Sequence, residues 1–254
     1  MSKEIESSFF MVSPLALNQA RFYQQLFSGI ATYEELANRL LKEIRAAYAF
    51  RQVESVRELS RLLLNIPVKE YQLIAQYYLI WCQCRELKFH DKVLDNIIEQ
   101  TETYKAKALI SRAAFEVYKG NVESSLYFYA EALKANPTVS DYIVASRGIA
   151  TVKSMEGYHA AALKDLEGLI PLLRYAEPLT HYEVINSYAV ESLENNRLEE
   201  AYNASLLAVS SPFGIYYPEW QQTHSEASQQ AHRGRSTVFL SPARKLSNVV
   251  QASA

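Results

Sequence analysis

The stretch 106–137 constrains the fold of this chain more than any other part of the sequence. It has the pattern of two amphipathic helices joined by a tight turn at Gly120-Asn121 and closed by Asn136-Pro137. In the second helix, apolar and small residues recur every three or four positions and form one continuous face. A hairpin of this size cannot bury its own apolar face, so the stretch predicts further helix pairs stacked on either side.

The same pattern recurs along the chain. Thr32 and Glu35 form a capping box that predicts a helix start, and that helix pairs with one at 53–65. Further pairs are predicted at 68–87 with 91–103, at 140–155 with 158–173, and at 178–193 with 198–210. A small or β-branched residue follows each turn at intervals of 32–39 residues, at Val56, Val93, Ser125, Ala162 and Ala201. This period is typical of helix-turn-helix solenoids and predicts about five stacked pairs.

The composition agrees with an all-α fold. Only 7 Gly and 8 Pro occur in 254 residues, which argues against Gly-rich nucleotide-binding folds and many-turned β sandwiches. The net charge is −2, so no global basic field favours nucleic acid or an anionic membrane. Because no long apolar run or signal peptide is evident, and because Cys82 and Cys84 are spaced for different sides of a helix, we expect a soluble, cytoplasmic protein with free thiols.

The two ends of the chain differ from the repeats. We expect residues 1–13 to be a flexible arm, residues 14–231 to be the helical domain, and residues 232–254 to be a flexible tail. Predicted capping helices at 14–28 and 219–230 close the stack. The region from residue 227 onward has four basic and no acidic residues. One hypothesis is that residues 237–240 of this tail bind as an extended peptide in the groove of their own array or of a neighbouring one, which allows self-association.

The stretch 106–137 resembles a tetratricopeptide repeat (TPR), a helical pair of 34 residues. The family pattern is met at Ala113, Gly120, Ser125 (in place of Ala), Tyr129, Ala132 and Pro137. The pairs at 143–171 and 182–212 resemble it more loosely, and the resemblance declines over 32–212. Arg112 and Glu116 depart from the pattern, since the family usually has Leu and Tyr there. The resemblance implies a right-handed α-solenoid of about five helix pairs.

The resemblance also implies a non-enzymatic scaffold that holds a segment of a partner protein or a peptide in a concave groove. The carboxylate clamp best known in this family is not found in the sequence. The positions equivalent to the family's groove are Lys107, Ile110, Ser111, Ala114, Arg147, Thr151, Ser154, Asn186, Ser187 and Val190. Of these, Lys107, Arg147 and Asn186 are able to bond to the carboxylates or backbone of a partner; the alternative is that they are ordinary solvated helix residues.

The sequence contains no motif for catalysis, a metal or a cofactor. The five histidines do not lie three or four residues from one another or from a cysteine, and no nucleophile elbow, phosphate loop or dinucleotide fingerprint occurs. We therefore expect no enzyme and no cofactor. The main alternative function is a regulatory module that senses a ligand or peptide and acts on a separate output protein. Nucleic-acid binding is opposed by the acidic body of the chain.

Overall fold

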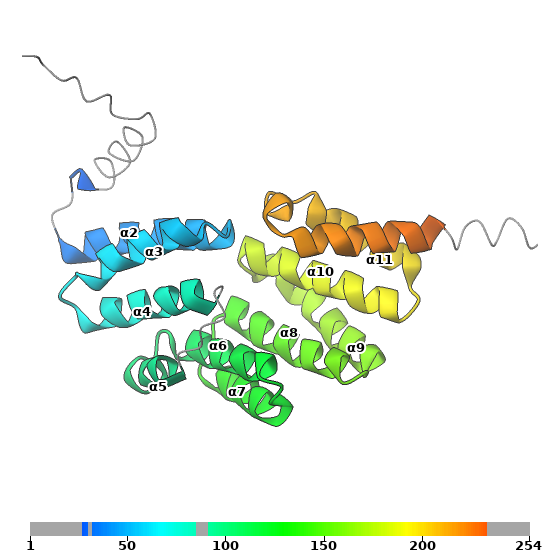
Figure 1. The fold of residues 1–254 in the computed structure, drawn as a ribbon, viewed down its shortest axis with the longest axis horizontal. Coiled ribbons are helices and arrows are strands. Elements are labelled where there is room, and N and C mark those ends of the chain that lie inside the picture. The colour runs from blue at the N-terminus through cyan, green and yellow to red at the C-terminus, as the bar shows by residue number, and fades with distance from the viewer. Residues whose placement is uncertain (1–26, 30–31, 85–90, 233–254) are drawn as a thin grey trace, which may run out of the picture.

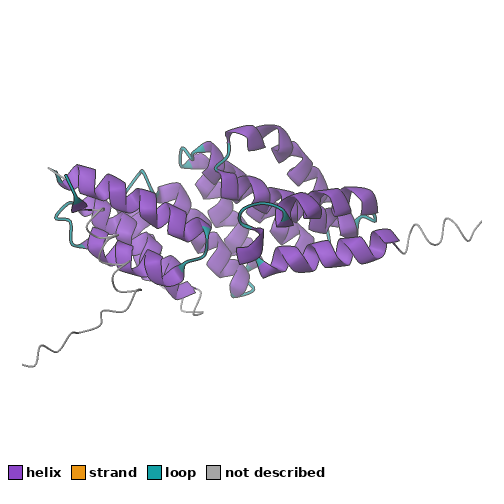
Figure 2. Cartoon of the chain, turned by 90° about the horizontal axis from the view of Figure 1, so that it is seen from above, coloured by secondary structure: helices purple, strands orange, loops and turns teal. Residues whose placement is uncertain are grey.

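The structure is a computed structural model that describes residues 27–29, 32–84 and 91–232. These residues form helices joined by short loops, and no strand occurs among them (Figure 2). The chain is therefore all-α, as predicted. The predicted arm at 1–13, most of the predicted helix at 14–28 and nearly all of the tail at 232–254 lie outside the described residues.

The described helices follow one another in the order expected from the sequence. Their bounds are α2 (Tyr33–Ala49), α3 (Val53–Leu64), α4 (Lys69–Cys84), α5 (Asp91–Gln100), α6 (Lys105–Tyr118), α7 (Val122–Lys134), α8 (Val139–Met155), α9 (His159–Leu169), α10 (Pro178–Glu194) and α11 (Leu198–Val209), with 3-10 helices η1 (Ile170–Tyr175) and η2 (Gly214–Tyr216). A last helix spans 218–232.

Local chemistry determines where these helices begin and end. At the start of α2, the Thr32 hydroxyl accepts from the Glu35 amide at 3.2 Å, and the Glu35 carboxylate accepts from the Thr32 amide at 3.3 Å, which confirms the capping box. The turns after α6 and α8 place Gly120 and Gly157 at φ values of 79° and 83°, in the left-handed region that glycine tolerates best.

The second helix of the pair at 140–173 is shorter than predicted. It ends at Leu169 and continues as the 3-10 helix η1, which has Pro171 in its first turn. Proline has no backbone N–H, so it cannot supply the next α-helical hydrogen bond there. Helix α5 also ends before its predicted end, at Gln100 and not at Thr103.

The helices pack mainly against their neighbours in sequence, but not evenly (Figure 1). From α6 onward each predicted pair packs closely, and the first helices of successive pairs, α6, α8 and α10, also contact one another. In contrast, α4 packs mainly on α3 and only slightly on α5, its predicted partner. The predicted pairing of α4 with α5 is therefore weak, and α5 packs instead on α6.

Small residues permit the close approach of helices in the second part of the chain. Ala113, Ser125 and Ala132 are fully buried, as the pattern at 106–137 predicts. A close contact of this kind joins Gly148 in α8 to Tyr129 in α7. A Cβ atom at position 148 would lie 2.3 Å from the Tyr129 ring, so only glycine fits there without displacing that ring.

Candidate functional site

Helices α6, α8 and α10 carry the residues predicted to form the groove, and we call the surface they share the inner face. Lys107 on α6 donates from Nζ to Asp141 Oδ1 on α8 at 2.6 Å. One helix further, Arg147 on α8 donates from Nη2 to Glu183 Oε2 on α10 at 3.0 Å. Each predicted cation of this surface thus pairs with a carboxylate on the first helix of the following pair. A carboxylate of a partner would have to compete with that pairing.

The Lys107–Asp141 pair is largely enclosed. The Asp141 side chain is 7 % exposed, and its other oxygen, Oδ2, accepts from the Thr138 hydroxyl at 2.7 Å. Burial by itself lowers the pKa of Lys107, but the charge of Asp141 and its hydrogen bond outweigh this effect and raise the pKa above its ordinary value. Lys107 is therefore a fixed cation that is committed to Asp141.

The predicted hydroxyl residues of the inner face bond within the chain. Thr151 and Ser187 each donate to the carbonyl four residues earlier, Arg147 and Glu183, at 3.0 Å. Ser111 on α6 donates to the Tyr77 hydroxyl on α4 at 3.4 Å. In contrast, the side-chain oxygen of Asn186 is buried and has no hydrogen-bond partner. Because the chain itself covers this oxygen, a ligand reaches it only if the Asn186 side chain turns outward.

The apolar members of the predicted set, Ile110, Ala114 and Val190, are half-buried. They add contact area to the inner face without directing a hydrogen bond. The remaining member, Ser154, lies 3.3 Å from His159 Nδ1. The same nitrogen of His159 lies 3.2 Å from Glu191 Oε2. A catalytic triad needs the nucleophile and the acid at different ring nitrogens, so this geometry does not support a triad.

Aromatic residues of the N-terminal helices adjoin the inner face. Tyr77 and Tyr78 on α4 pack edge to face with Tyr104 at centroid distances of 5.5 and 6.3 Å, and Tyr48 on α2 packs against Trp81 at 4.7 Å. Burial raises the pKa of Tyr48 well above its ordinary value, and the nearby Tyr77 and Glu183 raise it further. Tyr48 therefore stays neutral beside the Arg147–Glu183 pair.

The tyrosines on these helices differ in exposure: Tyr77, Tyr78 and Tyr129 are buried and Tyr71 is half-buried. The side chain of Tyr127 is exposed instead. It lines a shallow cavity of about 390 Å³ between α5, α6 and α7, together with Ile98, Phe128 and acidic and basic side chains. Most of these tyrosines thus pack between helices, whereas Tyr127 lies at the surface.

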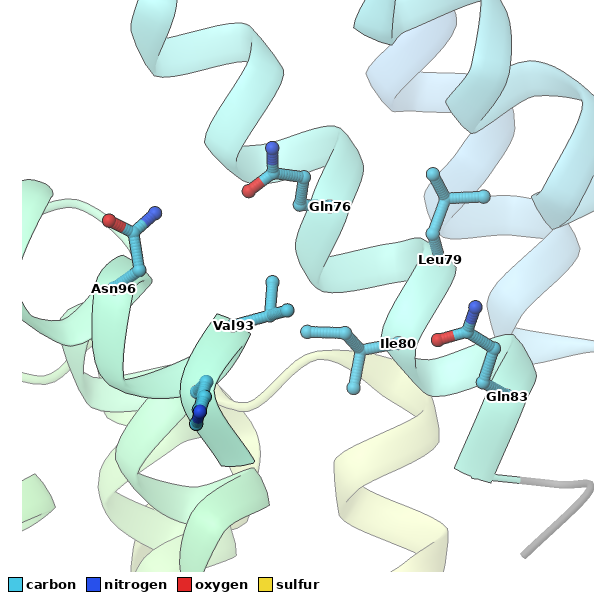
Figure 3. A pocket seen from close by; sticks show the side chains of 7 residues that line it. Gln76, Leu79, Ile80, Gln83, Val93 and Asn96 are labelled. Carbon is cyan, nitrogen blue, oxygen red and sulfur yellow. The ribbon is translucent and has the colours of Figure 1, made fainter. Parts of the chain in front are cut away.

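A second candidate site is the groove between α4 and α5, which we call the α4–α5 groove. It has a volume of about 490 Å³. Ile80 and Val93 point toward one another across it, and the amides of Gln76, Gln83 and Asn96 lie around them (Figure 3). Apolar contacts flanked by amides suit a peptide segment, because amides bond to backbone groups of any sequence. Sequence reasoning missed this groove because the pattern predicts that α4 and α5 pack as a pair.

The departures from the repeat pattern at Arg112 and Glu116 also have a structural role. The buried Glu116 carboxylate accepts from Arg112 Nη1 at 2.6 Å, from Asn121 Nδ2 at 2.7 Å and from Lys119 Nζ at 3.2 Å. Arg112 and Lys119 also pair with Asp91 at 2.8 and 2.6 Å. This network ties α5 to α6 and to the turn before α7, so the two charged residues contribute to helix packing.

Comparison with known proteins gives no relative for this chain: no family model, no curated protein and no solved structure matches it. Within the described part of the chain, His, Cys, Asp and Glu residues do not gather in any group of three or more that could hold a metal ion. The helices that the structure describes are also too short or too polar to cross a membrane.

Proposed function

We propose that this chain is a non-enzymatic scaffold, a right-handed α-solenoid of about five TPR-like helix pairs, that binds a segment of a partner protein in the cytoplasm on the inner face. The observation that carries the proposal is the direct contact of α6 with α8 and of α8 with α10. The residues predicted to form the groove lie on α6, α8 and α10, so they are carried by helices that are neighbours in space. Such a row of first helices is the surface on which helical solenoids hold extended partners.

The chemistry of the inner face supports a polypeptide ligand. Asn186 offers a buried acceptor without a partner, and Arg147 and Glu183 offer an ion pair whose side chains are 26 % and 23 % exposed. A peptide backbone supplies donors and acceptors for both kinds of group. A positively charged side chain of a partner can pair with Glu183, and a negatively charged one can pair with Arg147. Either event leaves the other member of the ion pair without its present partner.

Site-specific photo-crosslinking in cells tests this proposal. A photoreactive residue at Thr151, which is exposed and one turn from Arg147 on α8, should form a covalent adduct with a partner protein. A matched residue at Ser124, which is exposed on α7, should not. The Thr151 adduct should be lost when Arg147→Glu and Asn186→Ala are introduced together. An adduct that forms equally at both positions, or that survives both substitutions, would contradict binding at the inner face.

The same experiment distinguishes the inner face from the α4–α5 groove. A photoreactive residue at Leu79, which lines that groove, reports a partner there, and Gln76→Ala is the matched substitution. An adduct at Leu79 but not at Thr151 would support the scaffold function and would indicate that the partner binds between α4 and α5, not on α6, α8 and α10.

A further inference from the structure

The two ends of the described helical array contact one another. Residues 49–51 at the end of α2 meet residues 213–220, which follow α11 (Figure 1). We call this contact the clasp. The residues that it joins lie 165 and 168 positions apart in the sequence, with helices α3–α11 between them.

Arg51 makes the polar half of the clasp. Its guanidinium lies 3.6 Å from the centroid of the Tyr217 ring and donates to both carboxylate oxygens of Glu219, from Nη1 to Oε2 at 3.0 Å and from Nη2 to Oε1. Nη1 also lies 3.4 Å from the Tyr216 carbonyl oxygen, to which it donates. A planar guanidinium can stack on a ring and form a forked pair with a carboxylate at once, and a lysine ammonium cannot.

The preceding residue makes the aromatic half of the clasp. The Phe50 ring lies 5.3 Å from the Phe213 ring and, edge to face, 5.3 Å from the Tyr216 ring. The Tyr217 hydroxyl donates to the Ala49 carbonyl at 3.2 Å. Phe213 and Tyr217 belong to a buried cluster with Trp220, so the receiving side is a built surface with its own core.

The backbone of residues 49–51 has an unusual conformation at Arg51. Arg51 has a φ of 53°, in the left-handed region that residues other than glycine rarely adopt. The ion pair of the clasp is partly solvated: the Arg51 side chain is 22 % exposed, and that of its partner Glu219 is 50 % exposed. The ion pair of the clasp opens at modest cost, because solvated ion pairs contribute little to stability. The larger cost of opening is the exposure of the Phe50 ring and of the buried cluster against which it packs.

We infer that residues 213–220 form a receptor for an aromatic residue followed by arginine, that Phe50-Arg51 occupies it within the chain, and that a partner protein presenting the same pair binds by displacing them. The receptor supplies rings for the aromatic residue, and a ring face and a carboxylate for the arginine. This site adjoins α10, since Tyr182 and Ile185 of that helix pack against the same cluster as Phe50. Its test measures binding of a peptide at residues 213–220 and does not measure binding of a partner at the inner face or in the α4–α5 groove.

The test uses the full chain and a synthetic peptide of residues 46–53, which contains the Phe-Arg pair. Arg51→Glu should open the clasp by repulsion from Glu219, and the peptide should bind this variant roughly tenfold more tightly than the wild type, because the wild-type receptor is already occupied. A peptide with lysine in place of its arginine should bind the variant more weakly. Calorimetry or fluorescence anisotropy measures the affinities, and circular dichroism verifies folding.

Two further variants make the result decisive. Arg51→Ala provides an open receptor if Arg51→Glu fails to fold, and Glu219→Arg together with Arg51→Glu should restore the clasp and reduce peptide binding to the wild-type level or below. Hydrogen exchange of the amides at 213–220 should quicken roughly tenfold in the open variants and recover in the charge swap. Equal peptide affinity in all variants, or exchange that does not respond to Arg51→Glu, would overturn the inference.

A second copy of this chain is another possible source of the Phe-Arg pair. Light scattering of the wild type over a range of concentrations tests it. A monomer throughout supports a separate partner protein. Dimers that the 46–53 peptide dissociates would overturn that assignment, because they would identify the occupant as another copy of the chain.

Discussion

The N-terminal region, α2–α5, and the C-terminal region, α6–α11, differ in the size of the residues that pack between their helices. In the C-terminal region the tightest contacts are made by small residues, among them Ala113, Ala145 and Ala189, all fully buried. In the N-terminal region the contacts are made by bulky ones such as Leu40, Leu63 and Tyr78. Small residues let backbones approach closely, whereas large side chains hold helices apart.

This difference accounts for the candidate sites. Where small residues meet, successive pairs stack closely and first helices touch, which creates the inner face. Where large rings fill the space between α2, α4 and the start of α6, the contact of α4 with α5 is slight and leaves the α4–α5 groove. Departure from a regular repeat thus created a cavity instead of only reducing packing.

The largest expected effect on stability comes from a large-to-small substitution in the core of either region. Leu63→Ala and Leu166→Ala each remove a fully buried leucine, and each should cost about 2–5 kcal/mol of unfolding free energy. The two leucines belong to separate apolar clusters, so the two costs should add in the double variant. Hydrogen exchange during denaturant titration should show that Leu63→Ala acts first on α2–α4 and Leu166→Ala on α8–α10. Uniform loss of protection in both would contradict a division into two regions.

The next effect tests close approach in the C-terminal region. Gly148→Val should destabilise the protein by about 1–3 kcal/mol, because the added atoms overlap the Tyr129 ring. Gly168→Ala is the matched control, since a Cβ there meets nothing within 4 Å. Alanine is also the better helix former, so this variant should be more stable by about 0.5–1 kcal/mol. Opposite shifts in thermal midpoint are expected, and a loss of stability in both would show that space at position 148 is not the cause.

A smaller effect compares two helix caps. Thr32 caps α2 at the surface, whereas Thr138 caps α8 and also bonds to Asp141, the partner of Lys107. Both substitutions by alanine should fall in the range of about 0.5–2 kcal/mol, with Thr138→Ala near the upper end and Thr32→Ala near the lower. Chemical denaturation measures both. Equal costs would indicate that the Asp141 network adds nothing to the cap.

The smallest effect is a pH dependence at the junction of the two regions. The hydrogen bond from Asn121, followed by those from Lys119 and its charge, lowers the pKa of Glu116 despite its burial. A carboxyl whose pKa is lower in the folded state stabilises the fold above its ordinary pKa, and this stabilisation is lost as the pH falls through the lowered value. Glu116→Gln should therefore show a smaller loss of stability than the wild type between about pH 5 and about pH 3. Parallel curves for the two proteins would contradict this assignment.

The sequence by itself determined where the helices lie. Thr32, Gly120 and Gly157 act within a few residues of their own position, so they predict the start of α2 and the turns after α6 and α8 correctly. The apolar periodicity predicts the helices themselves but places the ends of α5 and α9 too late. The residues predicted to form a groove lie on α6, α8 and α10, and the structure shows that α8 contacts both of the other two helices. Local signals are sufficient for this because capping, turn formation and amphipathicity depend on spacing along the chain.

Only the tertiary structure decided which helices pack and which charges pair. The slight contact of α4 with α5, the commitment of Lys107 to Asp141 and the meeting of Arg51 with Glu219 all join residues far apart in the chain. No local pattern encodes these contacts, because they follow from the volumes of side chains on several helices at once. The stretch 106–137 therefore predicted the class of fold, whereas the size and position of rings such as Tyr48 and Tyr78 determined how the N-terminal helices pack.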